Sequence, residues 1–193
     1  MRTCDGLLFC PVTGKTSIIV PVSKTDNIFL IGPMGVGKTT IGKRLAKKLD
    51  KTFIDTDKEM EKRTGATINL IFDVEGEQGF RERETRLIDE LTSENGIVLA
   101  TGGGAVLAEI NRKILTGRGT VVYLSASPEL LMKRTAHDRH RPLLQTKNKL
   151  GRIRSLLNER EPIYKSIADM DLKIDKLSVK QVIEQITGYL ETL

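Results

Sequence analysis

The segment from Gly32 to Thr39 reads Gly-Pro-Met-Gly-Val-Gly-Lys-Thr and fits the pattern G-x-x-x-x-G-K-[ST] of phosphate-binding loops in full. Glycines let backbone N–H groups converge on phosphate oxygens, and the N-terminus of the following helix adds a partial positive charge. In this pattern Lys38 reaches the β- and γ-phosphates of a nucleoside triphosphate, and the Thr39 hydroxyl is offered to Mg²⁺. The motif therefore predicts an enzyme that binds a nucleoside triphosphate with magnesium and uses it as a phosphoryl donor.

Two carboxylates, Asp55 and Asp57, follow a short apolar run at 52–54. One of them would hold the magnesium shell through water, because Mg²⁺ keeps several of its waters in protein sites. The other would orient an attacking hydroxyl or accept its proton. The alternative is that Asp57 caps a helix while Asp55 is solvated, and the sequence leaves both interpretations open.

An arginine and a glycine triplet are candidates for the acceptor side. Arg81 lies three residues before Glu84 on a charged helical stretch, which favours either a surface ion pair or a guanidinium fork aimed at an acceptor carboxylate. The triplet 102–104 follows an apolar run at 97–100. It is either a plain loop or a place where the backbone comes close to a small ligand.

A group of basic side chains runs from the end of one predicted helix through a polar loop into the next. Its arginines are Arg134, Arg139, Arg141 and Arg160. They form either a solvated basic face or part of a lid that closes over the triphosphate and excludes water. His137 and His140 have no third ligand nearby in the sequence, so we interpret them as solvated lid residues and not as a metal site.

Composition excludes several classes of protein. With 193 residues, 39% hydrophobic and 29% charged, the chain suits one folded, soluble domain. No apolar run approaches the roughly 20 residues that span a bilayer. Aromatic residues make up only 4%, so base-stacking platforms for nucleic acid are not expected, and the net charge of +6 instead suggests anionic ligands. The two cysteines lack metal-site spacing and no secretory signal is recognisable, which predicts a cytoplasmic protein.

Short apolar runs alternate with helical patterns. Strands are expected at 28–31, 52–54, 97–100, 120–124 and 172–174. Helices are expected at 37–49, at 57–94 with breaks near Gly65 and 76–79, from Pro128 onward, at 147–167 and at 178–190. This alternation predicts a parallel sheet with helices on both faces, and ligands in such folds bind beyond the carboxyl ends of the strands. Residues 1–26 show no clear period and are interpreted as an N-terminal extension.

Taken in order, the motifs resemble those of shikimate kinases over residues 27–190. Besides the phosphate loop, the matching pieces are Asp55-Thr56-Asp57, Gly76-Glu77-Gln78 with Phe80-Arg81-x-x-Glu84, Gly102-Gly103-Gly104-Ala105, Arg141-Pro142-Leu143-Leu144 and Arg160-x-Pro162-x-Tyr164. The resemblance implies an α/β fold, a P-loop three-layer sandwich of the nucleoside-monophosphate-kinase type, with a five-stranded parallel sheet in order 2-3-1-4-5. It implies a single kinase domain at 27–193, with an acceptor-binding insertion at about 55–85 and a lid at about 134–148.

The implied reaction is ATP-dependent phosphorylation of the 3-hydroxyl of shikimate, on the route to chorismate and aromatic amino acids. By resemblance, Asp57 binds the shikimate hydroxyls and is the candidate base, Lys38 and Arg141 act on the phosphates, and Thr39 and Asp55 hold Mg²⁺. The shikimate carboxylate would be clamped by Arg81 and Arg160 with help from the triplet Gly102, Gly103 and Gly104. The nucleotide would be held by Gly35, Val36, Gly37, Lys38, Thr39, Thr40, Arg134 and Arg141, with Arg134 stacked on adenine.

One feature departs from the family pattern. Some members have a proline near the start of the last helix that covers adenine, and the stretch 175–178 contains none. The alternatives are another small-molecule kinase, such as a gluconate kinase, or a nucleotide-dependent regulatory protein without turnover. The expected partners are the small molecules shikimate and ATP, without nucleic acid or membrane, and the expected state is a monomer.

Overall fold

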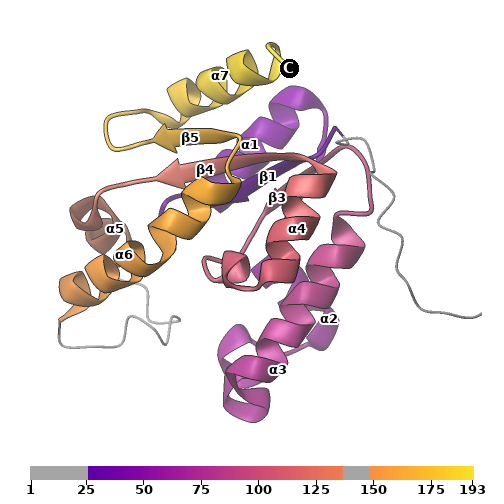
Figure 1. The fold of residues 1–193 in the computed structure, drawn as a ribbon, viewed down its shortest axis with the longest axis vertical. Coiled ribbons are helices and arrows are strands. Elements are labelled where there is room, and N and C mark those ends of the chain that lie inside the picture. Colours follow the sequence, from indigo (N-terminus) through magenta and orange to yellow (C-terminus); the bar gives the residue numbers. More distant parts are fainter. Residues whose placement is uncertain (1–25, 137–147) are drawn as a thin grey trace, which may run out of the picture.

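The computed structural model describes residues 26–136 and 148–193. Five strands form one sheet: β1 (Ile28–Ile31), β2 (Thr52–Asp55), β3 (Ile97–Ala100), β4 (Thr120–Ser125) and β5 (Met170–Lys173). All four strand pairs are parallel, and the order across the sheet is β2-β3-β1-β4-β5. The expected fold and strand order are therefore confirmed (Figure 1).

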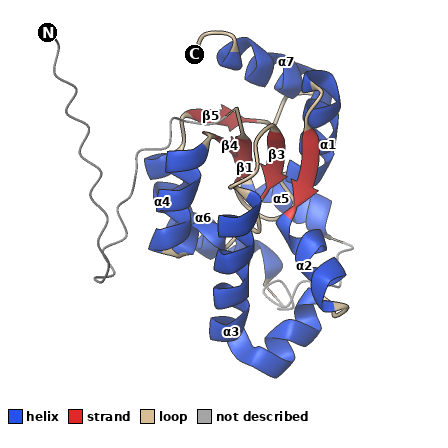
Figure 2. Ribbon diagram, turned by 90° about the vertical axis from the view of Figure 1, so that its right-hand side faces the viewer, coloured by secondary structure: helices blue, strands red, loops and turns tan. Residues whose placement is uncertain are grey.

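Helices cover both faces of the sheet. They are α1 (Lys38–Leu49), α2 (Thr56–Thr64), α3 (Ile68–Leu91), α4 (Glu109–Arg118), α5 (Pro128–Thr135), α6 (Lys149–Ile167) and α7 (Val179–Leu190), with a 3₁₀ turn at Ala105–Leu107. Figure 2 shows α1 and α7 on one side of the sheet and α4 on the other. The molecule is thus a three-layer sandwich of helix, sheet and helix.

Strand β1 shows how the sequence divides its core between the two faces. Successive side chains of a strand point to opposite sides. Ile28 and Leu30 pack with side chains of α1, α5 and α7, whereas Phe29 and Ile31 pack with side chains of α3 and α4. All four β1 side chains are buried, as a strand covered on both faces requires. This central position fixes the carboxyl end of β1, from which the phosphate loop leaves.

Glycines interrupt the long helical stretch after β2 at the expected places. Gly65 ends α2 with a φ of 68°, and Gly76 bends α3 with a φ of 70° and a ψ of −178°. Gly79, in contrast, lies within α3. Figure 1 shows α2 and the first part of α3 as an arm that extends away from the sheet. The later part of α3 packs against one face of the sheet, and its Glu84 lies beside Gly102, just after the carboxyl end of β3.

Two elements differ from expectation. No element was expected at 105–119, yet the 3₁₀ turn and α4 lie there; α4 has no side-chain cap at its N-terminus and contains Gly117, so its local signals are weak. Strand β5 begins two residues earlier than expected, and only Leu172 of its four residues is buried, as befits an edge strand. Within residues 26–136 and 148–193, no helix has the length and apolar character needed to cross a membrane.

Candidate active site

The phosphate loop connects β1 to α1, and the side chain of Lys38 binds carbonyl groups of the loop itself. Gly37 caps α1 with a φ of 106°, a left-handed conformation that favours glycine. The Lys38 ammonium donates to the carbonyl oxygens of Gly32 at 2.7 Å and Pro33 at 2.9 Å. The Lys38 ammonium therefore lies inside the loop, next to the N-terminus of α1. The partial positive charge of a helix N-terminus attracts phosphate oxygens.

Thr39 and Asp55 meet at the end of β2. The Thr39 hydroxyl donates to Asp55 Oδ2 at 2.6 Å, and Asp55 Oδ1 accepts the backbone N–H of Lys58 at 3.3 Å. Asp55, and not Asp57, is thus the N-cap of α2, so the alternative with Asp57 as cap and Asp55 solvated is wrong. The hydroxyl and carboxylate oxygens beside the phosphate loop are the hard ligands that Mg²⁺ prefers, and this donor set fits the ion.

A second carboxylate pair lies beyond the carboxyl end of β3. A methyl group added at Gly102 would lie 2.8 Å from Glu84 Oε1 and 3.0 Å from Asp57 Oδ1. The absence of a side chain at Gly102 is what lets the two acids approach each other. Glu84 is only 1% exposed, and its burial raises the pKa of the Glu84 carboxyl, an effect that the Arg81 guanidinium opposes.

Arg81 binds that buried acid. Its Nη1 donates to Glu84 Oε2 at 2.7 Å, and the Arg81 side chain is 20% exposed. The pair is therefore not the solvated surface pair that spacing alone would allow. A side chain at Gly104 would overlap the Arg81 guanidinium, so the glycine triplet packs directly against this arginine.

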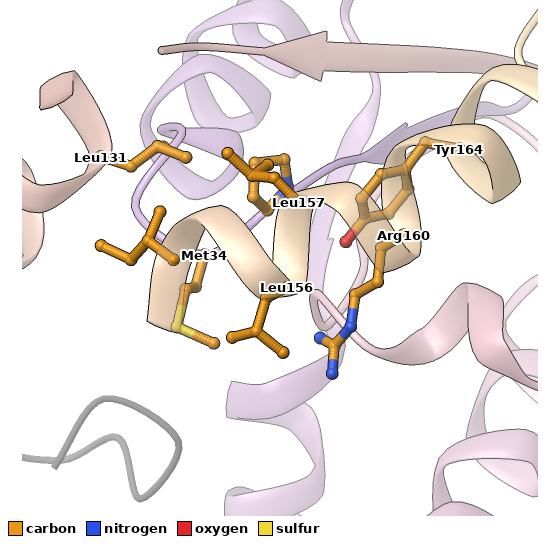
Figure 3. A pocket seen from close by; sticks show the side chains of 8 residues that line it. Met34, Leu131, Leu156, Leu157, Arg160 and Tyr164 are labelled. Carbon is orange, nitrogen blue, oxygen red and sulfur yellow. The ribbon is translucent and has the colours of Figure 1, made fainter. Parts of the chain in front are cut away.

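Arg160 comes to the same triplet from helix α6. Its Nη1 donates to the Gly103 carbonyl oxygen at 3.4 Å, and the Tyr164 hydroxyl donates to the same oxygen. Arg160 is 7% exposed, and its Nε is buried with no hydrogen-bond partner among the described residues. Figure 3 shows Arg160 and Tyr164 projecting from α6 beside an apolar cavity that Met34 and Leu157 also line.

The nucleotide side has a cavity of its own. It measures about 250 Å³ and is bordered by the phosphate loop with Thr40, by Arg134, by Leu177 before α7 and by Val179 at the start of α7. Arg134 donates to the Val36 carbonyl oxygen at 2.8 Å, which fixes it over the loop. Where some family members are expected to have a proline, this chain presents aliphatic side chains to the cavity.

The structure thus assembles the predicted donor residues 35–40 with Asp55 and Arg134, and the acceptor residues Asp57, Arg81, 102–104 and Arg160. Arg141, Arg139 and the two histidines lie outside the described residues. Two residues that sequence reasoning gave no role, Glu84 and Tyr164, complete the acceptor side. Their motif positions were the available signal, since Glu84 follows Arg81 by one helical turn and Tyr164 follows Arg160 likewise.

A phosphate loop after the central strand of a parallel five-stranded sheet, facing a second site with two arginines and two acids, defines a P-loop kinase of small molecules. The shikimate kinase family model matches residues 34–191, and the chain belongs to that family. A shikimate kinase of Legionella pneumophila (strain Corby) is 54% identical over 169 residues, which cover 88% of this chain and 97% of the relative.

Comparison with solved structures supports the same family. A shikimate kinase from Acinetobacter baumannii, in complex with shikimate, has a TM-score of 0.84 and 45% identity, and the match covers 88% of this chain and 94% of the other. A gluconokinase from Sinorhizobium meliloti 1021 has a TM-score of 0.59 at 16% identity, covering 88% of this chain and 94% of the other, which is a likeness of fold alone. The shikimate kinase assignment is therefore favoured over the gluconate kinase alternative.

Proposed function

We propose that this protein transfers the γ-phosphoryl group of ATP to the 3-hydroxyl of shikimate and forms shikimate 3-phosphate and ADP. The observation that carries the proposal is the placement of Arg81 and Arg160 on either side of the Gly103–Gly104 peptide. A methyl group at Gly103 would lie 3.3 Å from the Met34 backbone nitrogen in the phosphate loop, so this peptide adjoins the donor site. Two guanidinium groups suit a carboxylate, which the planar fork binds through two parallel hydrogen bonds.

On the donor side, the loop would hold the triphosphate together with magnesium. Bound Mg²⁺ would neutralise charge on the β- and γ-phosphates, and Thr39 and Asp55 are the residues that would hold it. The Lys38 ammonium would exchange its two carbonyl partners for phosphate oxygens, a short movement within the same loop. Adenine would lie in the cavity between Arg134 and Leu177.

On the acceptor side, Asp57 would orient the 3-hydroxyl. The hydroxyl oxygen attacks the γ-phosphorus, the bond between that phosphorus and the bridging oxygen to ADP breaks, and Asp57 takes the hydroxyl proton. Glu84 lies beside Asp57 across Gly102, so the proton would pass into a site with two neighbouring carboxylates. Arg81 and Arg160 would hold the carboxylate and so keep the ring from rotating while the 3-hydroxyl faces the γ-phosphorus.

The lid at about 134–148 with Arg141, the extension at 1–26, the monomeric state and the cytoplasmic location stay predictions. The same holds for the absence of nucleic-acid and membrane partners. The described residues already supply the loop, the acids and the arginine pair of the proposed site.

The test is an ADP-release assay with ATP and magnesium on the purified chain. We expect shikimate to be phosphorylated with a kcat/KM at least about a hundredfold above that for gluconate or a nucleoside monophosphate, since an acceptor that leaves the arginines unpaired forfeits charge-assisted hydrogen bonds. Product analysis by ³¹P nuclear magnetic resonance would place the phosphate on the 3-oxygen. Faster phosphorylation of gluconate or of a nucleotide would refute the proposal.

A further inference from the structure

Tyr164 is a buried residue to which the proposed reaction assigns no task. It lies one helical turn after Arg160 on α6, and only 1% of it is exposed. Its ring stacks on Tyr123 of β4, with 4.9 Å between the ring centroids and an angle of 18° between the planes. Its hydroxyl donates to the carbonyl oxygen of Gly103. A rigidly held aromatic ring thus presents one polar group to the acceptor site (Figure 3).

The oxygen that accepts this bond belongs to the peptide between Gly103 and Gly104. Arg160 donates to the same oxygen at 3.4 Å, while the Gly104 end of the peptide packs against the guanidinium of Arg81. The Gly103 end lies against the phosphate loop. One peptide unit therefore sits between both arginines and the donor site, so its orientation sets the spacing of the groups that would bind the acceptor.

Three consecutive glycines have little intrinsic stiffness, and other contacts must supply it. The ends of the triplet are fixed locally, because Thr56 Oγ1 accepts the Gly102 N–H at 3.0 Å and the Ala105 N–H donates to the Gly102 carbonyl oxygen at 3.2 Å. The middle peptide depends on the side chains of α6. The burial that orders Tyr164 also raises the pKa of its phenol to about 12, so the hydroxyl stays a donor even in alkaline solution.

The two donors on this oxygen are not equivalent once an acceptor arrives. A carboxylate makes stronger, charge-assisted hydrogen bonds to a guanidinium than a peptide carbonyl does, so Arg160 is drawn to the ligand. The ring of Tyr164 is held by its stack on Tyr123, which does not depend on a bound acceptor. The tyrosine bond is then the one that keeps the peptide in place while Arg160 binds.

We propose that Tyr164 is a positioning residue of the acceptor site, whose hydroxyl fixes the Gly103–Gly104 peptide and thereby the relative placement of Arg81 and Arg160. The proposal rests on the proposed function, because it takes the acceptor carboxylate as the group that the two arginines bind. Tyr164 itself does not touch the reacting atoms. Its contribution is to acceptor affinity and alignment, and not to nucleotide binding.

The experiment compares Tyr164→Phe with Tyr123→Phe in the full chain. Both variants keep the aromatic stack and lose one buried hydroxyl, but only Tyr164 bonds to Gly103, while Tyr123 borders a different cavity with Ser125 and Asp171. We expect Tyr164→Phe to raise the KM for shikimate about five- to tenfold, with the KM for ATP within about twofold of native, because one hydrogen bond to the acceptor platform is lost. Tyr123→Phe should leave both KM values near native.

A second measurement needs no substrate. In ligand-free protein, the amide resonances of Gly103, Gly104 and Ala105 should shift or broaden in Tyr164→Phe and stay in place in Tyr123→Phe. If the native chain does not phosphorylate shikimate, the proposed function fails while these amide signals still decide whether Tyr164 fixes the peptide. Unchanged amide signals, or KM values for shikimate that respond equally to both variants, would overturn the inference.

Discussion

The two halves of the active site are built in different ways. The phosphate loop of the nucleotide half comes from one continuous segment, 32–40, in which backbone carbonyls accept hydrogen bonds from the Lys38 ammonium, and Asp55, Arg134 and Leu177 join it from other elements. The acceptor half gathers side chains from α2, α3 and α6 around the glycine turn after β3. Two of the four buried side-chain polar atoms that lack a partner within the described residues lie in this half, Glu84 Oε1 and Arg160 Nε.

This difference in hydrogen bonding predicts different roles for the two halves in binding. Buried polar atoms are nearly always hydrogen-bonded in native proteins, and an unpaired one costs free energy. The Lys38 ammonium of the nucleotide half has carbonyl partners before its ligand arrives, whereas the acceptor half holds an acid oxygen and an arginine nitrogen that a polar ligand or water would satisfy. Substitutions in the first half should therefore disturb transfer to any acceptor, and substitutions in the second should act selectively on shikimate.

The largest effect is expected at Lys38. Lys38→Ala removes the cation that the loop directs toward the transferred phosphoryl group, and kcat/KM should fall by roughly 10³-fold. Thermal unfolding should change little, since the helix and sheet contacts are retained. Lys43→Ala, an exposed lysine on the same helix, is the control and should retain native kinetics. A Lys38→Ala enzyme with near-native turnover would show that the loop does not serve phosphoryl transfer.

A substitution at Asp57 tests whether this residue serves the acceptor half or the nucleotide half. Asp57→Asn keeps the size of the side chain but removes the negative charge, so kcat should fall roughly 10²- to 10³-fold, as for loss of a general base. ATP affinity, measured by titration calorimetry, should stay within about twofold, because Asp55 and Thr39 remain in place. The matched control is Asp73→Asn, at an exposed position on α3. Equal losses in ATP binding and turnover would assign Asp57 to the nucleotide half.

Selectivity for the acceptor should be clearest at the arginine pair. Arg81→Lys and Arg160→Lys keep the charge but lose the planar fork, so the KM for shikimate should rise roughly ten- to a hundredfold. The KM for ATP should change far less. Arg154→Lys, on the exposed side of α6, should leave both constants unaltered. If the two variants weaken ATP and shikimate alike, the clamp belongs to the nucleotide.

The same contrast explains what the sequence could predict. The phosphate loop and the strands beside it could be predicted because their signals are local. These signals are the spacing of glycines, the apolar runs and the order of the motifs. The acceptor half depends on contacts between residues that are far apart in the sequence. From spacing alone, Arg81 and Glu84 could form a surface ion pair as well as part of an acceptor site. Helix α4 was missed because its N-terminus lacks a side-chain cap. The role of Asp55 as the cap of α2 required knowledge of where the helix begins.

The smallest effect should come from the part of the nucleotide half that departs from the family pattern. No proline occurs at 175–178, and Leu177 lines the same cavity as Arg134. Trimming a partly buried leucine to alanine removes apolar contact worth about 1 kcal/mol, given roughly 0.8 kcal/mol per buried methylene. Leu177→Ala should therefore raise the KM for ATP about three- to sixfold and leave the KM for shikimate unchanged.

Because Leu177 also packs against the hydrophobic core on the α1 and α7 side of the sheet, the melting temperature of this variant should fall slightly. Lys176→Ala, its exposed neighbour, controls for changes to the segment itself. Steady-state kinetics with each substrate varied in turn would separate the two constants. A rise in the KM for shikimate, with that for ATP unaltered, would contradict the division, because a residue of the nucleotide half would then govern the acceptor. A rise confined to ATP would identify an aliphatic side chain as the adenine cover in this enzyme.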